Sequence, residues 1–524
     1  MQRDEMVGRL ARRDRPWDLA VVGGGATGLG IAVDAAARGY DVALFEAYDF
    51  GKGTSSRSTK LVHGGVRYLR QGNIPLVMDA LRERGILRAN APHLVHDLAF
   101  VVPNYDWWEA PFYGIGLKVY DALAGRYGFG PSRLLSKEET VERLPTIETE
   151  GLRGGVVYHD GQFDDARLLV HLARTAAGLG AVLTNYAPVT GLLKDGTGVV
   201  AGVRVEDREA GSTMEIAAKT VINATGPFAD GLRRLDDEAA RPMIRASQGI
   251  HIVLERRFLP GDSAIMVPHT DDGRVLFAVP WHDRVIVGTT DTPVDTIDVE
   301  PRPLADEISF VLEHAARYLT QDPEPGDVLS AFAGLRPLVG SDDADDTASL
   351  SRDHTLQISP TGLVTITGGK WTTYRKMAED AVDHAAVLAG LDPVPCTTRD
   401  LQIHGYHPAA ERFGDWAVYG ADAPELTALA MEVPGGDERI HPRLPARWAE
   451  VTWAVRFEMA RTVEDVLSRR TRSLLLDAAA SVEVAEAVAR RMADELGRTD
   501  DWVAAQVEEY GQLAAGYLPG GAAG

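Results

Sequence analysis

A glycine-rich turn between an apolar run and a helical segment limits the fold more than any other feature. Residues 18–46 read DLAVVGGGATGLGIAVDAAARGYDVALFE. Residues 19–22 predict a buried parallel strand, and residues 26–38 carry apolar side chains at helical spacing before Gly39, a good helix C-cap. Residues 41–45 predict a second strand. The order strand, helix, strand is a βαβ unit, which indicates an α/β fold with a parallel sheet.

The glycines of this turn match a dinucleotide-binding pattern. Gly23, Gly25 and Gly28 form G-x-G-x-x-G, in which the first permits the turn, the second lets a pyrophosphate approach and the third lets helix and strand pack closely. The helix N-terminus offers N–H groups to phosphate. Glu46 ends the second strand, where an acid binds ribose hydroxyls and disfavours a 2′-phosphate. A simple packing turn is the alternative, but the complete unit favours a cofactor.

Two later segments repeat the step from strand to glycine. Residues 221–226 read VINATG, and residues 363–376 read LVTITGGKWTTYRK. Three such segments meeting on one ligand favour FAD over NAD, because an NAD domain usually needs only one. Ala224, Gly226 and Gly369 are therefore predicted to contact the cofactor.

Composition and charge limit the other classes of function. The 524 residues are enough for roughly two to four domains. The chain has 76 acidic and 54 basic residues. Because of this negative net charge, we expect it neither to bind nucleic acid nor to be attracted as a whole to anionic lipid. Cys396 is the single cysteine, so no intrachain disulfide is expected. The sequence has no signal peptide, no run of 18 apolar residues and no metal-site spacing.

Strand and helix signals divide the chain into three predicted domains. The region around residues 246–290 is rich in strand patterns, with a hairpin turn predicted at 281–284, and the composition becomes helical from about residue 398. We predict a Rossmann-like FAD-binding domain (15–90, 151–245 and 330–392), a β-rich substrate-binding domain (91–150 and 246–329) and an all-α C-terminal domain (398–520).

Taken together, the motifs of the chain resemble one known family. They include VVGGGATGLGIAVDAAARGYDVALFE, TSSRSTKLVHGGVRYL, YHDGQFDDARLL, VINATGPF, SQGIHIVL, VPWHDRVIVGTTDT, FAGLRPLV, SRDHTL and TGGKWTTYRKMAEDAV. The chain resembles the FAD-dependent, quinone-linked (aerobic-type) glycerol-3-phosphate dehydrogenases of the D-amino-acid-oxidase-like flavoprotein superfamily. The resemblance spans residues 18–385, and residues 450–477 resemble the helical cap of that family.

The resemblance implies a reaction and its partners. It implies oxidation of sn-glycerol 3-phosphate to dihydroxyacetone phosphate by non-covalent FAD, with electrons passed to a membrane quinone. It also implies a cytoplasmic protein peripherally attached to the inner face of the cell membrane. The alternatives are a soluble oxidase that reduces O₂ to H₂O₂, an enzyme acting on an amino acid, and a catalytically silent flavin-binding regulatory module. A homodimer is a further open alternative.

The resemblance also assigns the substrate cavity. Arg is suited to phosphate because its planar fork binds two oxygens, and the candidate cations are Arg67, Arg336, Arg352, Lys370 and Arg375. The residues carried over from the family are Arg67, Tyr68, His251, Arg336, Arg352 and Lys370. His251 is the expected proton acceptor, and Arg336 is expected to share the catalytic role by stabilising the developing alkoxide. A histidine satisfied within the core is the alternative for His251.

Residues 55–69, SSRSTKLVHGGVRYL, place four basic side chains beside a glycine pair. Within the resemblance, this loop is expected to run along the flavin and beneath the substrate. Ser55, Ser56 and Lys60 are predicted to bond the cofactor, and His63, Gly64 and Gly65 to allow close approach to its ring. Covalent attachment through His63 is the minor alternative. Arg57 is expected to point outward or to form an ion pair.

Three further features have structural or membrane interpretations. Asp164, Asp165 and Arg167 are expected to cap a helix and form an ion pair where domains cross. For membrane attachment, the candidates are the basic residues in 461–472 and the apolar segment 107–120. The simpler interpretation of residues 107–120 is a buried helix.

Overall fold

The predicted βαβ unit forms in the computed structural model, which describes residues 1–65, 73–107, 109–267, 270–271, 274–340 and 354–521. Strand β1 (Trp17–Val22) leads through the glycine turn into helix α2 (Ala26–Ala37) and then strand β2 (Val42–Phe45). The two strands pair in parallel, with Ala20 opposite Ala43. The Rossmann-like part of the prediction is confirmed.

This unit lies at the centre of an eight-stranded sheet. The main strand order is β17 (His354–Ile358), β18 (Val364–Gly368), β10 (Ser212–Asn223), β1, β2 and β7 (Val182–Thr184). Strands β8 (Val189–Lys194) and β9 (Val200–Asp207) form a hairpin beside β10. Helices α2, α7 (Asp165–Gly178), α8 (Ala229–Asp236) and α10 (Tyr374–Leu388) belong to this layer, and α1 (Arg3–Ala11) lies at its β7 end.

The second sheet has ten strands and is mostly antiparallel. Its main order is β15 (Thr292–Val294), β11 (Ile244–Glu255), β14 (Arg284–Gly288), β13 (Leu276–Trp281), β12 (Ala264–Val267), β4 (Val95–Asn104), β6 (Gly154–Phe163) and β3 (Leu61–Val62). Strand β16 (Ser330–Val339) pairs with β11, and β5 (Arg133–Leu135) with β6. Its helices are α4 (Ile74–Asn90), α5 (Glu109–Ala124), α6 (Lys137–Arg143) and α9 (Ala305–Ala316).

Two strands correct the predicted domain boundaries. Strands β6 and β16 lie in ranges predicted for the FAD-binding domain, but both pair within the ten-stranded sheet. Strand β6 pairs with β4 over its whole length and then runs directly into α7, so it carries the chain from one sheet to the other. A local strand pattern does not specify its partner, which is why the sequence misplaced both strands.

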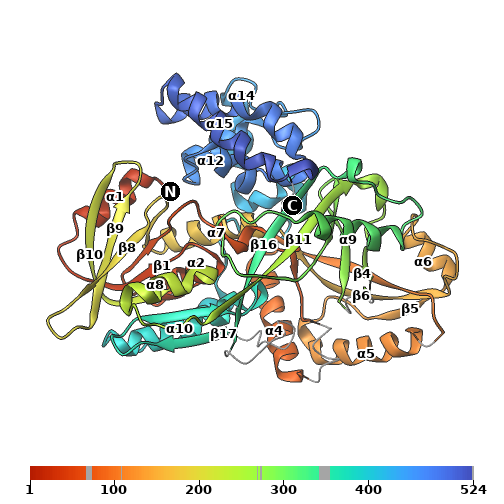
Figure 1. Ribbon diagram of the computed structural model, residues 1–524, viewed down its shortest axis with the longest axis horizontal. Helices are drawn as coiled ribbons and strands as arrows, with labels where there is room; N and C mark the ends of the chain where they lie inside the picture. Colours follow the sequence, from red (N-terminus) through yellow and green to blue (C-terminus); the bar gives the residue numbers. More distant parts are fainter. Residues whose placement is uncertain (66–72, 108, 268–269, 272–273, 341–353, 522–524) are drawn as a thin grey trace.

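The C-terminal region is helical, as predicted. It contains α11 (Ala423–Glu432), α12 (Trp448–Phe457), α13 (Ser473–Leu476), α14 (Ala478–Leu496) and α15 (Asp500–Ala515), and a π-helical turn covers Asp465–Arg470. Its apolar core includes Val253 of β11 and Phe332 of β16, so these helices pack onto the ten-stranded sheet. Figure 1 shows them as a cap on one side of the molecule, opposite α4 and α5. No helix within the described ranges is long and apolar enough to cross a bilayer.

Candidate active site

A cavity of about 440 Å³ opens at the carboxyl ends of β1, β2, β10 and β18. Ligands of open parallel sheets bind in this position. The three predicted strand-to-glycine segments meet here, as the sequence suggested. The predicted residues that line this first cavity are Gly23, Gly25, Glu46, Ser55, Ala224, Gly226, Gly369 and Lys370.

The geometry of the glycine turn requires the absence of side chains. Gly23 has φ +108°, and a Cβ there would lie 2.6 Å from the carbonyl oxygen of Ala224. A Cβ on Gly28 would lie 1.9 Å from the Gly23 carbonyl oxygen. Gly28 therefore lets α2 pack against the turn without lining the cavity, which is the role predicted for it.

Two polar side chains that line this cavity accept hydrogen bonds from backbone N–H groups. The backbone N–H of Ala26, at the start of α2, donates to Ser55 Oγ at 3.0 Å. Ser55 thus lies at the helix N-terminus, where a phosphate group is favoured. Glu46 accepts from the N–H groups of Gly24 (2.6 Å) and Tyr48 (2.9 Å), and burial raises its pKa. Its carboxylate lines the cavity, and its bonding to a ribose stays a prediction.

A second cavity, of about 320 Å³, adjoins the first. The two share Thr54, Pro337, Gly369, Lys370 and Trp371. The predicted residues that line the second cavity are His63, Gly65, His251, Arg336, Gly369 and Lys370. They come from four separate stretches of the chain, so the fold brings together most of the described residues assigned to substrate and flavin ring.

His251, on β11, is buried at the wall of the second cavity. Its Nε2 lies 2.9 Å from Thr59 Oγ1, and its ring stacks on Phe332 with centroids 5.0 Å apart. Its Nδ1 has no hydrogen-bond partner among the described residues. Burial, followed by the charges of Lys60 and Arg336, holds the pKa of His251 well below its usual value. The imidazole is therefore neutral near pH 7.

Arg336, on β16, is held by the segment after β14. Its Nη2 donates to Thr289 Oγ1 (3.0 Å) and to the Thr290 carbonyl (2.9 Å), and its Nη1 lies 3.2 Å from Asp291 Oδ1. The guanidinium is thus oriented while it still lines the cavity. The sequence argument missed Thr59, Thr289 and Asp291. The stretch TTDT directly after a strand was the available signal for the last two.

Besides Gly28, three predicted cofactor residues, Ser56, Lys60 and Gly64, lie outside both cavities. Lys60 is fully buried, and its Nζ donates to Asp165 Oδ2 (2.7 Å) and to the Ser56 carbonyl (2.9 Å). Ser56 therefore contributes its carbonyl to an ion-pair site. Gly64 donates its N–H to Tyr120 Oη at 2.9 Å, and an added Cβ would meet Leu81 and Tyr120 at 2.4 Å. Its lack of a side chain accommodates helices α4 and α5.

Two basic candidates are engaged in buried ion pairs. Arg375 donates to both carboxylate oxygens of Glu83, each at 2.7 Å, so it does not belong to the substrate site. Arg57 pairs with Glu300 at 2.7 Å, which agrees with the ion-paired alternative, although it also lines the second cavity. Arg67, Tyr68 and Arg352 lie outside the described residues.

The structural interpretation of residues 164–167 is confirmed. Asp164 Oδ1 accepts from the Arg167 N–H at 2.9 Å and caps α7. The Arg167 guanidinium pairs with Glu458 of the C-terminal region at 2.5 Å. Asp165 pairs with Lys60 and with Arg472, at 2.7 and 2.9 Å. These contacts join α7 to the C-terminal helices.

Within the described ranges, no cluster of three or more His, Cys, Asp or Glu side chains is arranged to hold a metal ion.

Comparison with known proteins agrees with this geometry. Residues 18–375 match the family described as FAD dependent oxidoreductase, and residues 360–503 match the C-terminal domain of alpha-glycerophosphate oxidase. The chain therefore belongs to the FAD-dependent oxidoreductase family, and its cofactor is FAD. The glycine cradle at Gly23, the N–H groups at the start of α2 and the acid at the end of β2 fit this group.

Within that family, the chain is similar to glycerol-3-phosphate dehydrogenases. It is 40% identical to the mitochondrial enzyme of Mus musculus over 538 residues, covering 96% of this chain and 73% of that one. It is 41% identical to the mitochondrial enzyme of Arabidopsis thaliana over 523 residues, covering 92% and 83%. The solved structure of the Bacillus halodurans enzyme complexed with FAD superposes with a TM-score of 0.80 at 30% identity, covering 98% and 97%.

Proposed function

We propose that the protein oxidises sn-glycerol 3-phosphate to dihydroxyacetone phosphate with non-covalently bound FAD, and that the electrons pass to a quinone. One observation carries the assignment of substrate. A neutral buried imidazole and two basic side chains, those of His251, Arg336 and Lys370, line a cavity that joins the FAD cavity directly. The relatives that match nearly the whole chain are named for this reaction.

The reaction removes a hydroxyl proton and a hydride from the same carbon. When bound, FAD supplies the hydride acceptor at its N5 atom. His251 accepts the hydroxyl proton, which its neutral imidazole does without first losing a proton of its own. Arg336 stabilises the negative charge that develops on the substrate oxygen, since its guanidinium is already oriented by Thr289 and Asp291.

The phosphate of the substrate is assigned to basic side chains at the cavity. Lys370 lies where the two cavities meet, so it places charge beside both the flavin and the substrate. We include Arg67, Tyr68 and Arg352 in this phosphate site as predictions, because they lie outside the described residues. Binding the remote phosphate fixes the reacting carbon against the flavin and lowers the entropic cost of reaction.

The outer face of α5 supports peripheral membrane contact. Phe112, Ile115 and Val119 of α5 are exposed by 48, 69 and 44%, and Trp107, which precedes the helix, by 77%. Leu117 and Tyr120 on the inner face are buried. A helix that is apolar on both faces is unusual in water. Helix α4 lies beside it and adds Ile74 and Met78, each almost half exposed. The interpretation of residues 107–120 as an ordinary buried helix is therefore corrected.

A bilayer is the proposed occupant of this face because the quinone is a lipid-soluble acceptor. Leu61 and Met266, which line the second cavity, belong to the same apolar cluster as Leu117 of α5. One packed apolar cluster thus extends from the inner face of α5 to the wall of the second cavity. The alternative basic site within 461–472 is not available to lipid, because Arg461 is bound to Glu209 and Arg469, Arg470 and Arg472 are buried.

An anaerobic titration tests the reaction. Glycerol 3-phosphate added to the FAD-loaded protein without oxygen is expected to bleach the flavin absorbance between 350 and 500 nm. A short-chain quinone is then expected to restore the colour, with little H₂O₂ when air replaces the quinone. A flavin that stays oxidised with glycerol 3-phosphate would overturn the substrate, and rapid H₂O₂ formation would favour the oxidase alternative.

A further inference from the structure

The segment after β2 faces the FAD cavity on one side and the C-terminal domain on the other. This segment, residues 46–57, is called the cofactor loop. Its residues Tyr48, Gly51, Lys52, Gly53, Thr54 and Ser55 line the first cavity. Asp49 lies among them but does not line the cavity, and its exposed fraction is 0%. The cofactor loop is therefore fixed partly by contacts on the side away from FAD.

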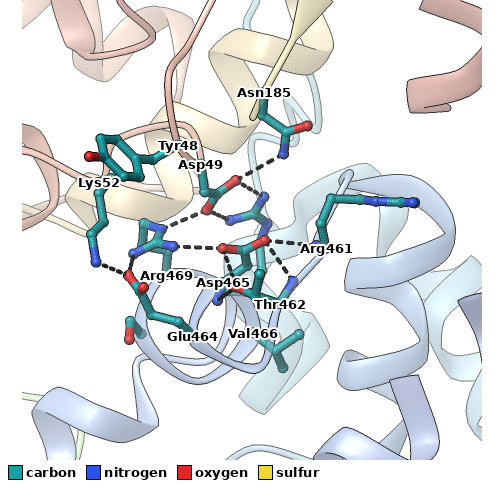
Figure 2. A network of polar contacts seen from close by, with 12 residues as sticks. Tyr48, Asp49, Lys52, Asn185, Arg461, Thr462, Glu464, Asp465, Val466 and Arg469 are labelled. Atoms are coloured by element: carbon teal, nitrogen blue, oxygen red, sulfur yellow. Dashed lines mark hydrogen bonds and ion pairs between the residues drawn. The ribbon is translucent and has the colours of Figure 1, made fainter. Parts of the chain in front are cut away.

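Asp49 binds two consecutive arginines of the C-terminal domain. Its Oδ2 accepts from Arg469 Nε at 2.6 Å and from Arg470 Nη1 at 2.7 Å, and its Oδ1 accepts from Arg470 Nη2 at 2.9 Å. Figure 2 shows this carboxylate at the centre of a network of polar side chains. Burial raises the pKa of Asp49, but Arg470 and Arg469 outweigh it and hold the pKa at about 2. Asp49 thus stays charged at neutral pH.

Two further contacts join the same loop to the same domain. Lys52 Nζ pairs with Glu464 Oε1 at 2.6 Å, and Glu464 also binds Arg469 at 2.6 Å. Arg472 Nη2 donates to the carbonyl of Ser56 at 2.8 Å. The loop is therefore held at Asp49, Lys52 and Ser56, before, within and after the residues 51–55 that line the cavity.

The C-terminal segment that makes these contacts has an unusual backbone. This segment, residues 464–472, is called the arginine turn. It contains the π-helical turn Asp465–Arg470, and Arg472 has φ +61°. Neighbouring side chains of an α-helix do not face each other, yet Arg469 and Arg470 converge on one carboxylate. Asp465 braces the turn by binding Arg469 (2.8 Å) and Tyr186 Oη (2.6 Å). Such π-helical turns often occur at functional sites.

We propose that the C-terminal domain is required for tight FAD binding, because the arginine turn holds the cofactor loop in the shape that encloses the cofactor. No residue of the arginine turn, which the structure describes completely, lines the first cavity. Its residues are positioning residues that act through Asp49, Lys52 and the Ser56 carbonyl. When these contacts are broken, FAD must order the loop at the expense of its own binding energy.

Two variants outside the cavity test this role. Asp49→Asn removes the charge that both arginines bind, and Glu464→Gln weakens the contact with Lys52. The FAD dissociation constant is measured by titrating apoprotein with FAD and following flavin fluorescence. It is expected to rise at least tenfold for Asp49→Asn and about threefold for Glu464→Gln. Hydrogen exchange of residues 46–57 in the apoprotein is expected to become faster in both variants.

A matched control separates loop positioning from general loss of stability. Arg38 forms a buried ion pair with Asp34 at 2.6 Å, at the end of α2 opposite the glycine turn. Arg38→Met is expected to lower the melting temperature and leave the FAD dissociation constant unchanged. Unchanged FAD affinity and loop exchange in both test variants would overturn the role of the arginine turn, whatever happens to their melting temperatures.

The test remains decisive if one variant does not fold. Glu464 is 21% exposed at its side chain and tolerates a neutral isostere more readily than Asp49. If Asp49→Asn is insoluble, Glu464→Gln decides, and parent-like FAD affinity with parent-like loop exchange overturns the assignment. FAD titration requires no substrate, so its outcome is independent of whether the second cavity takes glycerol 3-phosphate.

Discussion

The pKa of His251 depends on two cations outside its own strand, Lys60 and Arg336. Lys60 Nζ lies 5.1 Å from the Phe332 ring, which stacks on the imidazole, and Arg336 stands on the neighbouring strand β16. Asp165 opposes these charges from α7, and it is itself bound by Lys60 and Arg472. Burial and the two cations prevail, so the imidazole stays neutral.

Substitution of the two proposed catalytic side chains should separate binding from chemistry. Arg336→Met removes the contact with the substrate oxygen, so KM for glycerol 3-phosphate is expected to rise and flavin reduction to slow by about 10²-fold or more. His251→Asn removes the base, so reduction is expected to slow by about 10²-fold or more with a smaller change in substrate affinity. Stopped-flow flavin reduction under anaerobic conditions measures both. Parent-like reduction rates in both variants would show that the cavity assignment is wrong.

The charge of Lys60 predicts a change in pH dependence. Because the pKa of His251 is lowered, the parent rate of flavin reduction is not expected to fall as pH decreases through 6.5 on account of His251. Lys60→Met removes one of the charges that lower this pKa, so the rate is expected to fall at a higher pH than in the parent. Burial lowers the pKa of Lys60 itself to about 8, so the difference should be largest below pH 8.

The control for Lys60 is a lysine far from the cavities. Lys219 pairs with Asp18 and is 44% exposed at its side chain. Lys219→Met is expected to keep the parent pH profile of flavin reduction. Superimposable profiles for Lys60→Met, Lys219→Met and the parent would rule out the influence of Lys60 on His251.

At the scale of elements, local patterns predicted strands and helices better than they predicted partners or faces. The βαβ unit, the hairpin of β13 and β14 and the helical C-terminal region all follow from periodicity and turn residues. The pairing of β6 and β16 in the second sheet depends on contacts distant in sequence. Lys60 was assigned to the cofactor because it lies in the loop 55–69 of the family resemblance, whereas its positive φ of 63° and its buried partner Asp165 are set by the fold.

Helix α5 illustrates why exposure was hard to predict. Both of its faces are apolar, so the sequence favoured burial, and only the packing shows which face is left uncovered.

Ile115→Glu places a charge on the outer face of α5 and is expected to reduce co-sedimentation with lipid vesicles about tenfold, because burying a side chain of this size contributes about 1.5–3 kcal/mol. Met431→Glu is the control, since Met431 is 77% exposed on α11 in the cap. Equal losses for both variants would contradict membrane contact through α5.

Over the whole molecule, the joints between the sheets and the cap contain many buried polar groups. One such joint contains His93, which precedes β4, His171 of α7 and His404 of the C-terminal region. His93 Nε2 lies 3.0 Å from His171 Nδ1, and the latter lies 2.6 Å from the His404 carbonyl. The family and the overall fold could be predicted from motifs, but no local pattern pairs these histidines or the arginine turn with Asp49, because the partners lie far apart in the chain.

The histidine joint predicts a loss of stability in mild acid. Burial lowers the pKa of His93 to about 4 and that of His171 well below its usual value. The unfolded chain therefore binds more protons than the folded one below about pH 6.5, so stability falls as pH decreases from 6.5 towards 4. For His93 alone the loss is about 2 kcal/mol at pH 5.

His93→Gln has no such proton to bind, so its melting temperature at fixed FAD concentration should depend less on pH between 7.5 and 5. His384→Gln, on the exposed surface of α10, should keep the parent dependence. If the melting temperature of His93→Gln depends on pH as steeply as that of the parent, protonation of His93 is not what weakens the joint. The buried carboxylates Asp49 and Glu300 cannot replace it as the cause. Because their pKa values are lowered, they reduce stability only below about pH 4.5.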